Sequence, residues 1–548
     1  MTKIINYVKT NKLLFLLFLL FILIRLPLLD QINLLPDEKD TILSGWSIAK
    51  TGRDLFGKSF PLVFENISPN NPLSAIYFSA LWFLFIPIKT VFLSRLPFVL
   101  ISSLIVFISY SLIVKIAGDE KKAIVTTVIL CFNPWIFHLT RLALDIPLAI
   151  VFLFAGILLY LEKRKFLALT LFFLTAFTYQ GARILIPFLL IYLELFFLIN
   201  PDLTGIKKRF WKSFLPNSVK NLIFFIFVFA FITSLEPSIS KTRLSEIIFF
   251  DNEKNARVVD FKRNTSIASP LVRRFFDNKL SVSIDEIILN FTKGLDLSYL
   301  FKTGDYSPIN GNATTGQFLF IFIIFYFLGI IYLGKKGSRN DFYILGFIPL
   351  GTIPALLSTH GLTFSIRGVL SSIGFSYLIS LGVIFLAQGI KNYNLKKYSL
   401  IFLGGVFFIN VIFFVYGYYF RRPITVGELF YENERQLSLF LLKDDNPYTI
   451  YHQLPHNAFL SYIFFNNENL DLKEVQNNLA KKNYSYKEIT FKKCNHKVNY
   501  LKLRKAIIHE VCVEKDNYDI LSDINNPNVK YRIPYKDFSQ KFAYFILE

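Results

Sequence analysis

Long apolar runs separated by short polar connections occupy most of this sequence. The runs at residues 13–29 and 316–333 reach or approach the roughly 20 residues that a helix needs to cross a hydrocarbon core. Because no alternating strand pattern accompanies them, the pattern indicates helices rather than a barrel. It predicts eleven transmembrane helices, at residues 13–29, 94–115, 122–140, 146–161, 166–179, 184–200, 220–235, 316–334, 342–359, 368–388 and 399–419. The expected fold is a polytopic α-helical membrane protein.

The basic residues predict how the chain is oriented. Charged residues make up only 18% of the chain, against about 25% in soluble proteins, yet the net charge is +21. At least two Lys or Arg lie in each of the connections 115–122, 162–165, 206–220, 334–340 and 388–397. The positive-inside rule then predicts a multi-pass inner (plasma) membrane protein with a cytoplasmic N-terminus. Basic loops facing anionic lipid explain the charge more simply than nucleic acid does, so no nucleic-acid partner is expected.

The segment at residues 72–87 is apolar enough to be counted as a further span. Counting it would invert every later connection and place the basic loops outside. Trp82 and the prolines at both ends of the segment suit a helix that lies along the outer interface or dips into it. We therefore expect an interfacial helix here.

Three long polar segments fall on the outer side in this orientation, at residues 30–71, 236–315 and 421–548. The first two are expected to be outer loops of a transmembrane domain at residues 1–420. The last is long enough for a domain of its own, and strand-like pieces at 448–451 and 506–512 predict a small extracytoplasmic α/β domain. Cys494 and Cys512 both lie in it, and the sequence leaves open whether they pair or remain thiols.

Two adjacent carboxylates follow the first apolar run. Asp37 and Glu38 come directly after Pro36, and by themselves they suit the N-terminus of a helix, where acids favour the macrodipole. The string then continues with Thr-Gly at 51–52, Phe-Pro at 60–61 and Asn-Pro-Leu at 71–73. This longer pattern favours a functional role for the acidic pair.

Further charged residues stand at span ends that are expected to face outward. Arg141 and Asp145 lie between two predicted spans, and Arg183 directly precedes another. Asp305 lies in a Thr-Gly-Asp-Tyr-Ser-Pro loop, and His360 and Arg367 flank the loop before a later span. Each of them also fits an ordinary charge at a membrane edge, such as a helix-start acid or a snorkelling Arg. Charges at this depth are nevertheless expensive and often functional.

In order and spacing, these motifs resemble the GT-C superfamily of membrane glycosyltransferases over about residues 10–390. The similarity is to the branch that contains protein O-mannosyltransferases, the aminoarabinose transferase of lipid A and the RgtA/B/C/D-like enzymes. That branch has Asp-Glu after the first span and a Lys-Pro-Pro-like motif at the head of an interfacial helix. Asn71 stands where the branch usually has Lys, so it is open which group meets the donor phosphate there. The resemblance implies that Asp145 lies near the Asp-Glu pair.

The resemblance also implies a reaction: inverting transfer of a sugar from a polyprenyl-phosphate donor to a hydroxyl of a cell-envelope acceptor at the outer face. The implied catalytic residues are Asp37, Glu38 and Asp145, with Asp37 as the base that the attacking hydroxyl needs. The implied donor-phosphate ligands are Arg183, Arg367 and His360, since Arg can donate two parallel hydrogen bonds to phosphate. The other candidate residues are Asn71, Arg141 and Asp305.

No cofactor is expected. The sequence holds no Walker motif, no Gly-rich dinucleotide loop and no HExxH string. A divalent cation could gather among Asp37, Glu38 and Asp145, because carboxylate oxygens suit Mg²⁺ or Mn²⁺. Relatives in this branch are thought to work without one, so the sequence predicts no metal site.

Two other classes of protein fit the general pattern. A transporter or lipid flippase would need ionisable residues within its spans and matching halves, and here Glu194 is the main such residue and the halves show no symmetry. A non-catalytic envelope assembly protein would use the C-terminal domain as a binding surface. The sequence identifies neither the sugar nor the acceptor.

Overall fold

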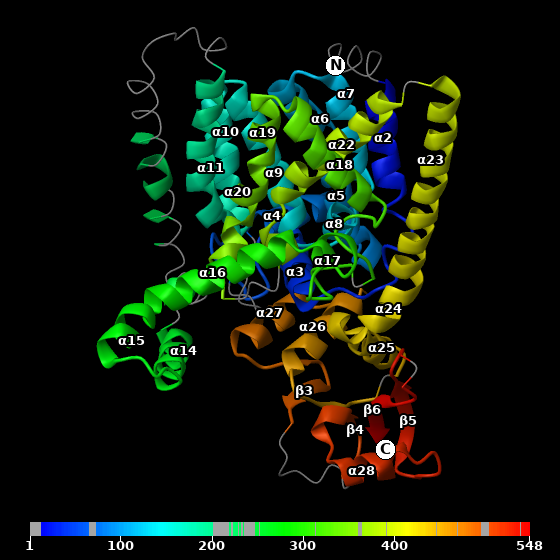
Figure 1. Ribbon diagram of the computed structural model, residues 1–548. Helices are drawn as coiled ribbons and strands as arrows, with labels where there is room; N and C mark the ends of the chain where they lie inside the picture. Colours follow the sequence, from blue (N-terminus) through cyan, green and yellow to red (C-terminus); the bar gives the residue numbers. More distant parts are fainter. Residues whose placement is uncertain are drawn as a thin grey trace. The chain divides into compact units, whose positions relative to one another are not determined.

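The computed structural model describes residues 12–64, 73–200, 219–220, 223–227, 230–231, 234, 247–250, 252–312, 314–359, 364–390, 392–444, 446–467, 470–494, 503–537 and 539–547. The chain divides into two compact units (Figure 1). The first, called the helical unit below, contains residues 1–25, 99–140 and 146–418. The second, called the mixed unit, contains residues 26–98, 141–145 and 419–548. Both units therefore combine segments that are far apart in the sequence.

The helical unit consists mostly of apolar helices. Its described helices are α2 (Lys12–Leu23), α6 (Ile105–Ala117), α7 (Glu120–Cys131), α8 (Pro134–Leu139), α9 (Ile146–Leu161), α10 (Lys165–Thr178), α11 (Gln180–Ile199), η2 (Ile248–Phe250), α14 (Asn252–Asn264), α15 (Pro270–Phe276), α16 (Lys279–Leu295), α17 (Leu297–Phe301), α18 (Phe322–Lys336), α19 (Arg339–Leu345), α20 (Phe347–Leu356), α21 (Phe364–Arg367), α22 (Ser371–Gly389) and α23 (Tyr393–Tyr416). A boundary between the units falls within α5 (Val91–Ser102) and another within η3 (Gly417–Arg421).

Within the described residues, four helical stretches are long and apolar enough to cross a membrane: Val91–Ala117, Gln180–Phe197, Ser371–Gly389 and Lys397–Thr425. Four shorter apolar helices accompany them, at Lys12–Leu23, Leu73–Phe85, Ile146–Leu161 and Lys165–Thr178. The expectation of a helical protein with membrane-spanning segments is confirmed in this coarser form. The number eleven is not confirmed, and the expected span at 220–235 falls partly outside the described residues.

Two of the predicted apolar runs each form two helices, and a local cap explains one of these divisions. The run at 122–140 is divided because the Asn133 side chain accepts a hydrogen bond from the Trp135 amide at 2.7 Å and so caps α8. The run at 342–359 is divided at Gly346, between α19 and α20. The apolar pattern does not locate such a boundary, because hydropathy is averaged over many residues whereas a cap ends a helix within a single turn.

The mixed unit joins the first polar loop to the C-terminal residues. Its described helices are α3 (Pro36–Thr51), α4 (Leu73–Phe85), α24 (Arg422–Thr425), η4 (Glu428–Phe430), α25 (Glu432–Leu441), α26 (Pro455–Phe465), α27 (Leu472–Ala480), η6 (Glu510–Cys512) and α28 (Lys515–Ser522). The predicted interfacial segment at 72–87 forms the helix α4. Gly45 lets α3 approach α4 closely, since a Cβ there would lie 2.8 Å from the Ile76 carbonyl oxygen. A larger residue at position 45 would push the two helices apart.

The C-terminal residues form a six-stranded sheet, and the sequence predicts the presence of strands there but not their number. Its strands are β1 (Thr449–His452), β2 (Ser485–Tyr486), β3 (Ile489–Lys493), β4 (Ala506–His509), β5 (Val529–Pro534) and β6 (Phe542–Leu547). Their order is β2-β3-β1-β4-β6-β5, in which β1 runs parallel to both β3 and β4. The other pairs are antiparallel. The carboxyl ends of β1 and β4 therefore lie side by side, with His452 and His509 as their last residues.

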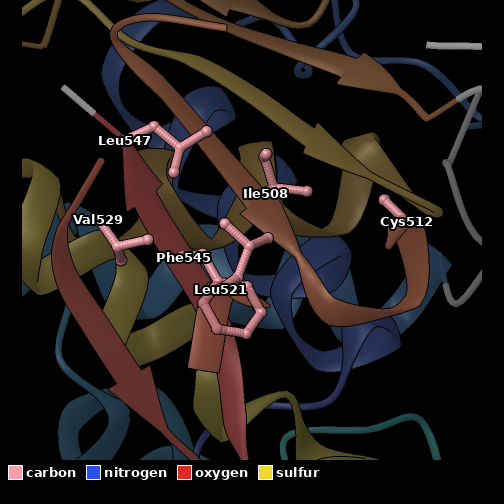
Figure 2. Close-up of a cluster of buried hydrophobic side chains, with 6 residues drawn as sticks. All are labelled: Ile508, Cys512, Leu521, Val529, Phe545 and Leu547. Atoms are coloured by element: carbon pink, nitrogen blue, oxygen red, sulfur yellow. The ribbon is translucent and has the colours of Figure 1, made fainter. Parts of the chain in front are cut away.

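One face of this sheet covers a small apolar core (Figure 2). The core contains Ile508, Leu521, Val529, Phe545 and Leu547, and Cys512 lies at its edge. Cys512 forms a disulfide bond with Cys494, and their Cα atoms are 5.6 Å apart. The structure thus decides the alternative that the sequence left open. The predicted strand at 506–512 ends at His509 because the turn η6 begins there.

Candidate active site

Glu38 is the centre of a hydrogen-bond network in the mixed unit. It lies in the first turn of α3, it is fully buried, and its Oε2 accepts the Leu35 amide at 2.9 Å. Oε1 accepts the Ala143 amide at 2.7 Å, which ties the loop at 141–145 to the start of α3. Asp145 is two residues from Ala143 in the same loop, and its expected proximity to the acidic pair stays a prediction.

Arg95, from α5, pairs with Glu38. Its Nε lies 2.9 Å from Oε1 and one terminal nitrogen lies 2.7 Å from Oε2, which makes a bidentate pair. The remaining guanidinium hydrogens go to the carbonyl oxygens of Leu29, Ile32 and Asn33 at 2.8 to 3.0 Å. Arg95 and Glu38 are 4% and 0% exposed, so this is a desolvated ion pair whose partners are well satisfied. The pair fixes the backbone that leads into α3.

Arg141 plays a similar part on the other side of the same loop. Its guanidinium donates to the carbonyl oxygens of Pro27 and Leu28 at 3.0 and 3.1 Å and to the Tyr419 hydroxyl at 2.9 Å. It is 5% exposed. Arg141 thus joins the end of the first apolar run to the start of the C-terminal residues.

Asp37 and Asp145 differ from these two residues in exposure. Both carboxylates are half-buried, whereas Glu38 and Arg141 are buried. Asp37 occupies the first turn of α3, where the amides of the helix N-terminus favour a negative charge. Of these three acids, Asp37 and Asp145 are therefore accessible from outside, whereas Glu38 is enclosed.

The helix α25 brings further charged groups to this region of the mixed unit. Tyr431, just before α25, has the uncommon backbone angle φ +56°, and its carbonyl oxygen accepts the Asn33 amide group at 2.6 Å. Lys39 is buried, and its ammonium lies 5.8 Å from the Tyr431 ring centroid. Burial lowers the pKa of Lys39 to about 8, a shift that Glu434, Glu38 and Glu432 oppose. The acids of α25 thus help to keep the Lys39 ammonium charged.

Glu434, His452 and His509 are the described group of side chains that could surround a metal ion. One ligand atom from each lies within 4.8 Å of the others, and all three are buried. However, Nδ1 of His452 accepts the Leu454 amide at 2.8 Å, and Nδ1 of His509 accepts the Val511 amide at 3.2 Å. A neutral imidazole then carries its proton on Nε2, and Nε2 of His452 lies 3.2 Å from Glu434 Oε1. Metal-binding His residues usually bind with one nitrogen and donate from the other, so this arrangement disfavours a metal.

This cluster predicts a loss of stability in acid. Burial, with a smaller effect of His452, lowers the pKa of His509 to about 4, so the folded protein holds this ring neutral while the unfolded chain protonates it near pH 6.5. The free energy of unfolding should therefore fall as the pH drops from about 6.5 to 4, by at most about 1.4 kcal/mol per pH unit. Burial raises the pKa of Glu434, but His452 and Lys39 lower it by more, so this pKa lies below its usual value. Below that pH window, protonation of Glu434 adds to the loss.

The measurement is the unfolding midpoint of the purified protein at several pH values, compared with the His509→Asn variant. Asn cannot titrate, so the variant should show a flatter profile between pH 6.5 and 4. Equal slopes for the two proteins would contradict the assignment.

In the helical unit, Asp305 joins two loops that the sequence marks separately. Asp305 is 7% exposed, and its Oδ2 accepts the Ser365 amide at 2.7 Å and the Ser365 hydroxyl at 2.5 Å. Its Oδ1 accepts the Ser307 amide at 2.9 Å. Burial raises the pKa of Asp305, although these hydrogen bonds and the charge of Arg367 oppose the shift. Arg367 is half-buried and close enough to Asp305 for the two charges to interact.

The remaining candidates are placed as follows. Arg183 lies in the first turn of α11 in the helical unit, is 8% exposed, and donates from Nε to the Ala176 carbonyl oxygen at 3.1 Å. Asn71 and His360 lie outside the described residues. The structure thus brings Glu38, Arg141 and the loop of Asp145 together in one unit, and Asp305 and Arg367 together in the other.

Sequence reasoning missed three residues of the mixed unit that matter to the site: Arg95, Lys39 and Glu434. Arg95 had one available signal, since it is a single charge within an apolar run. Lys39 was visible as part of the acidic string, but its burial was not. Glu434 had no local signal, because its partners come from strands that follow it in the sequence.

The comparisons with known proteins give distant likenesses. No protein-family model matches the sequence, and no curated protein matches it. Among solved structures, ArnT from Cupriavidus metallidurans bound to undecaprenyl phosphate is similar over 98% of both chains, with 12% identity and a TM-score of 0.48. An apo oligosaccharyltransferase from Archaeoglobus fulgidus is similar over 83% of this chain, with 11% identity and a TM-score of 0.46.

A second structure from the same archaeon, AglB with an inhibitory peptide and a dolichol-phosphate, gives 12% identity and a TM-score of 0.46. This chain spans 63 to 64% of the length of the two archaeal proteins. Both kinds of neighbour belong to the GT-C superfamily, which the motifs of this sequence resemble. At this identity and at TM-scores below 0.5, the likenesses are too distant to assign a substrate.

Proposed function

We propose that this protein is a membrane glycosyltransferase that moves a sugar from a polyprenyl-phosphate donor to a hydroxyl of a cell-envelope acceptor. The observation that carries the proposal is the network around Glu38. Three separate segments, namely the first loop, α5 and the loop at 141–145, meet there and hold the half-buried Asp37 at the start of α3. Such a preorganised, partly desolvated carboxylate suits a general base.

In the proposed reaction, the oxygen of the acceptor hydroxyl attacks the anomeric carbon while Asp37 takes the proton of that hydroxyl. The bond from that carbon to the phosphate oxygen breaks, and the polyprenyl phosphate leaves with the electron pair. The leaving group is stabilised by positive charge, for which Arg367 and Arg183 are the candidates. Asp305 would act by holding the Ser365 backbone, two residues before Arg367.

We further propose that Glu38 positions Asp37 and does not itself react. Both of its oxygens already accept hydrogen bonds from Arg95, and each accepts one backbone amide as well. A divalent ion that bound Glu38 would have to break this network. We therefore assign the base to Asp37, leave Asp145 as an accessory acid, and propose that the chemistry needs no cofactor.

The alternative of a transporter gains no support from Glu194. This buried acid of α11 accepts hydrogen bonds from the Tyr160 hydroxyl and from the Lys165 ammonium, the latter at 2.6 Å. Its charge is therefore paired within the helical unit. An ion-coupling site would need this carboxylate to exchange its partner during transport.

The test is sugar transfer by the purified protein in lipid nanodiscs. The donors are labelled sugars on undecaprenyl phosphate and on dolichol phosphate, and the acceptors are fractionated envelope lipids, glycans and proteins. We expect label to move from one of these donors to one acceptor fraction, or slowly to water when no acceptor is added. The proposal fails if the folded protein neither turns over nor binds any of the donors.

A further inference from the structure

The segment from Asn252 to Leu295 forms an arm in the helical unit (Figure 1). At its base, the Asn290 side chain of α16 donates to the carbonyl oxygens of Ala355, Leu356 and Ser358, at 3.3 to 3.5 Å, at the end of α20. Along its length, α14 pairs with α16 through Lys254–Glu286 and Lys262–Asp285, both at 2.5 Å. The arm is thus a helix pair with one defined packing face.

The opposite face of α16 carries an exposed apolar row. Leu280, Ile284 and Ile288 follow at intervals of four residues, so they lie on one side of the helix, and they are 61%, 44% and 56% exposed. Val282 and Ser283, on the inner side, are buried. The contacts of α16 with the described residues therefore bury only one side of this amphipathic helix.

The tip of the arm adds exposed apolar side chains to this row. In the short helix α15, Leu271, Phe275 and Phe276 are 81%, 73% and 65% exposed. Isolated exposed apolar residues are common, but a contiguous set with aromatic residues at its end marks an interaction surface.

The charge of the arm indicates which partner this surface fits. Residues 252–295 contain eight Lys and Arg against five Asp and Glu. Two of the acids, Asp285 and Glu286, are paired with lysines of α14. Arg273 and Arg274 lie in α15 beside the exposed aromatic residues. Arg274 is exposed, whereas Arg273 is half-buried and donates from one terminal nitrogen to the Arg263 carbonyl oxygen at 2.9 Å. An apolar stripe next to basic residues is the pattern of a helix that lies in the interface of an anionic bilayer.

We propose that the arm at residues 252–295 lies in the headgroup region of the membrane, with Leu280, Ile284, Ile288 and the tip of α15 among the acyl chains and with Arg273 and Arg274 against lipid phosphates. The arm belongs to a chain with helices apolar enough to span the bilayer, so lipid is the partner always within reach. The inference does not depend on the proposed reaction. It assigns a surface that the enzymatic proposal leaves unused.

The first experiment measures where the arm lies in the full-length protein. Single spin labels are placed at Ile284→Cys and, as the matched control, at Glu253→Cys in α14, whose side chain is 88% exposed. The background carries Cys131→Ala and keeps the Cys494–Cys512 disulfide. In nanodiscs we expect the label at 284 to collide mainly with oxygen, which concentrates in lipid, and the label at 253 mainly with a water-soluble nickel chelate. Equal nickel accessibility at the two sites would overturn the proposal, as would spin–spin broadening at 284, which would indicate a second copy of the chain.

The second experiment tests the contribution of the basic residues. Arg273→Gln with Arg274→Gln is compared with Arg257→Gln, an exposed residue of α14 that pairs with Glu253. The label at 284 is measured in phosphatidylcholine alone and in phosphatidylcholine mixed with phosphatidylglycerol. We expect the anionic lipid to deepen the label in the parent and in Arg257→Gln, but not in the double variant. An unchanged response in the double variant would remove the proposed phosphate contacts.

Discussion

Replacement of Asp37 by Asn is expected to lower sugar transfer by about a hundredfold to ten-thousandfold, the range that general base catalysis usually contributes. Asn has nearly the same shape and is tolerated in the first turn of a helix, so α3 should persist. It cannot accept the proton of the acceptor hydroxyl. The measurement is the initial rate of transfer with a polyprenyl-phosphate sugar, together with the unfolding midpoint of the same preparation.

The control is Asp30→Asn, in the same loop, because Asp30 is exposed and lies outside α3. This variant should keep both its activity and its stability. If Asp37→Asn transferred sugar at the rate of the parent protein, Asp37 would have no part in the chemistry and Asp145 would become the candidate base.

Replacement of Arg95 by Met is expected to destabilise the mixed unit by about 3 to 5 kcal/mol, which is the usual cost of removing one partner of a buried ion pair. The variant would leave the enclosed Glu38 carboxylate without its bidentate donor, and three backbone carbonyl oxygens would lose their hydrogen bonds as well. Sugar transfer should fall with it, because the start of α3 would no longer be held. The measurement is denaturant unfolding in detergent, with Arg53→Met, an exposed residue of the same unit, as the control.

A double variant separates the ion pair from its backbone contacts. In Arg95→Met with Glu38→Met, the buried charge is gone, so some stability should return relative to Arg95→Met alone. Full recovery is not expected, because the amides of Leu35 and Ala143 would then lack acceptors. A loss of under 1 kcal/mol in Arg95→Met would show that this pair does not hold the loop.

Several features of the fold could be predicted from local sequence. The apolar runs at 146–161, 166–179 and 184–200 correspond to α9, α10 and α11 within a few residues. The strand-like piece at 448–451 corresponds to β1. The periodicity and apolarity of neighbouring residues are enough to predict such elements, because they indicate whether a helix or strand buries one face or every face. Where caps intervene, as at Asn133, the same patterns misplace the ends.

The candidate site divides in the same way. Asp37 and Glu38 could be recognised because the motif is local, yet nothing in the motif separates an accessible acid from an enclosed one. That difference comes from Arg95, 57 positions further along, and from the amide of Ala143, 105 positions away. The pairing of Cys494 with Cys512 likewise needed the two segments to be placed next to each other.

Local sequence patterns are sufficient to predict a helical membrane protein with strands near its C-terminus and with acids after its first apolar run. Tertiary structure alone decided that Glu38 is enclosed by Arg95, that Lys39 lies buried beside Tyr431, and that two histidines face Glu434. The difference arises from how far along the sequence the interacting groups lie. Helices and strands follow from patterns within a few residues, whereas the solvation and charge of a side chain depend on groups that only the folded chain brings near.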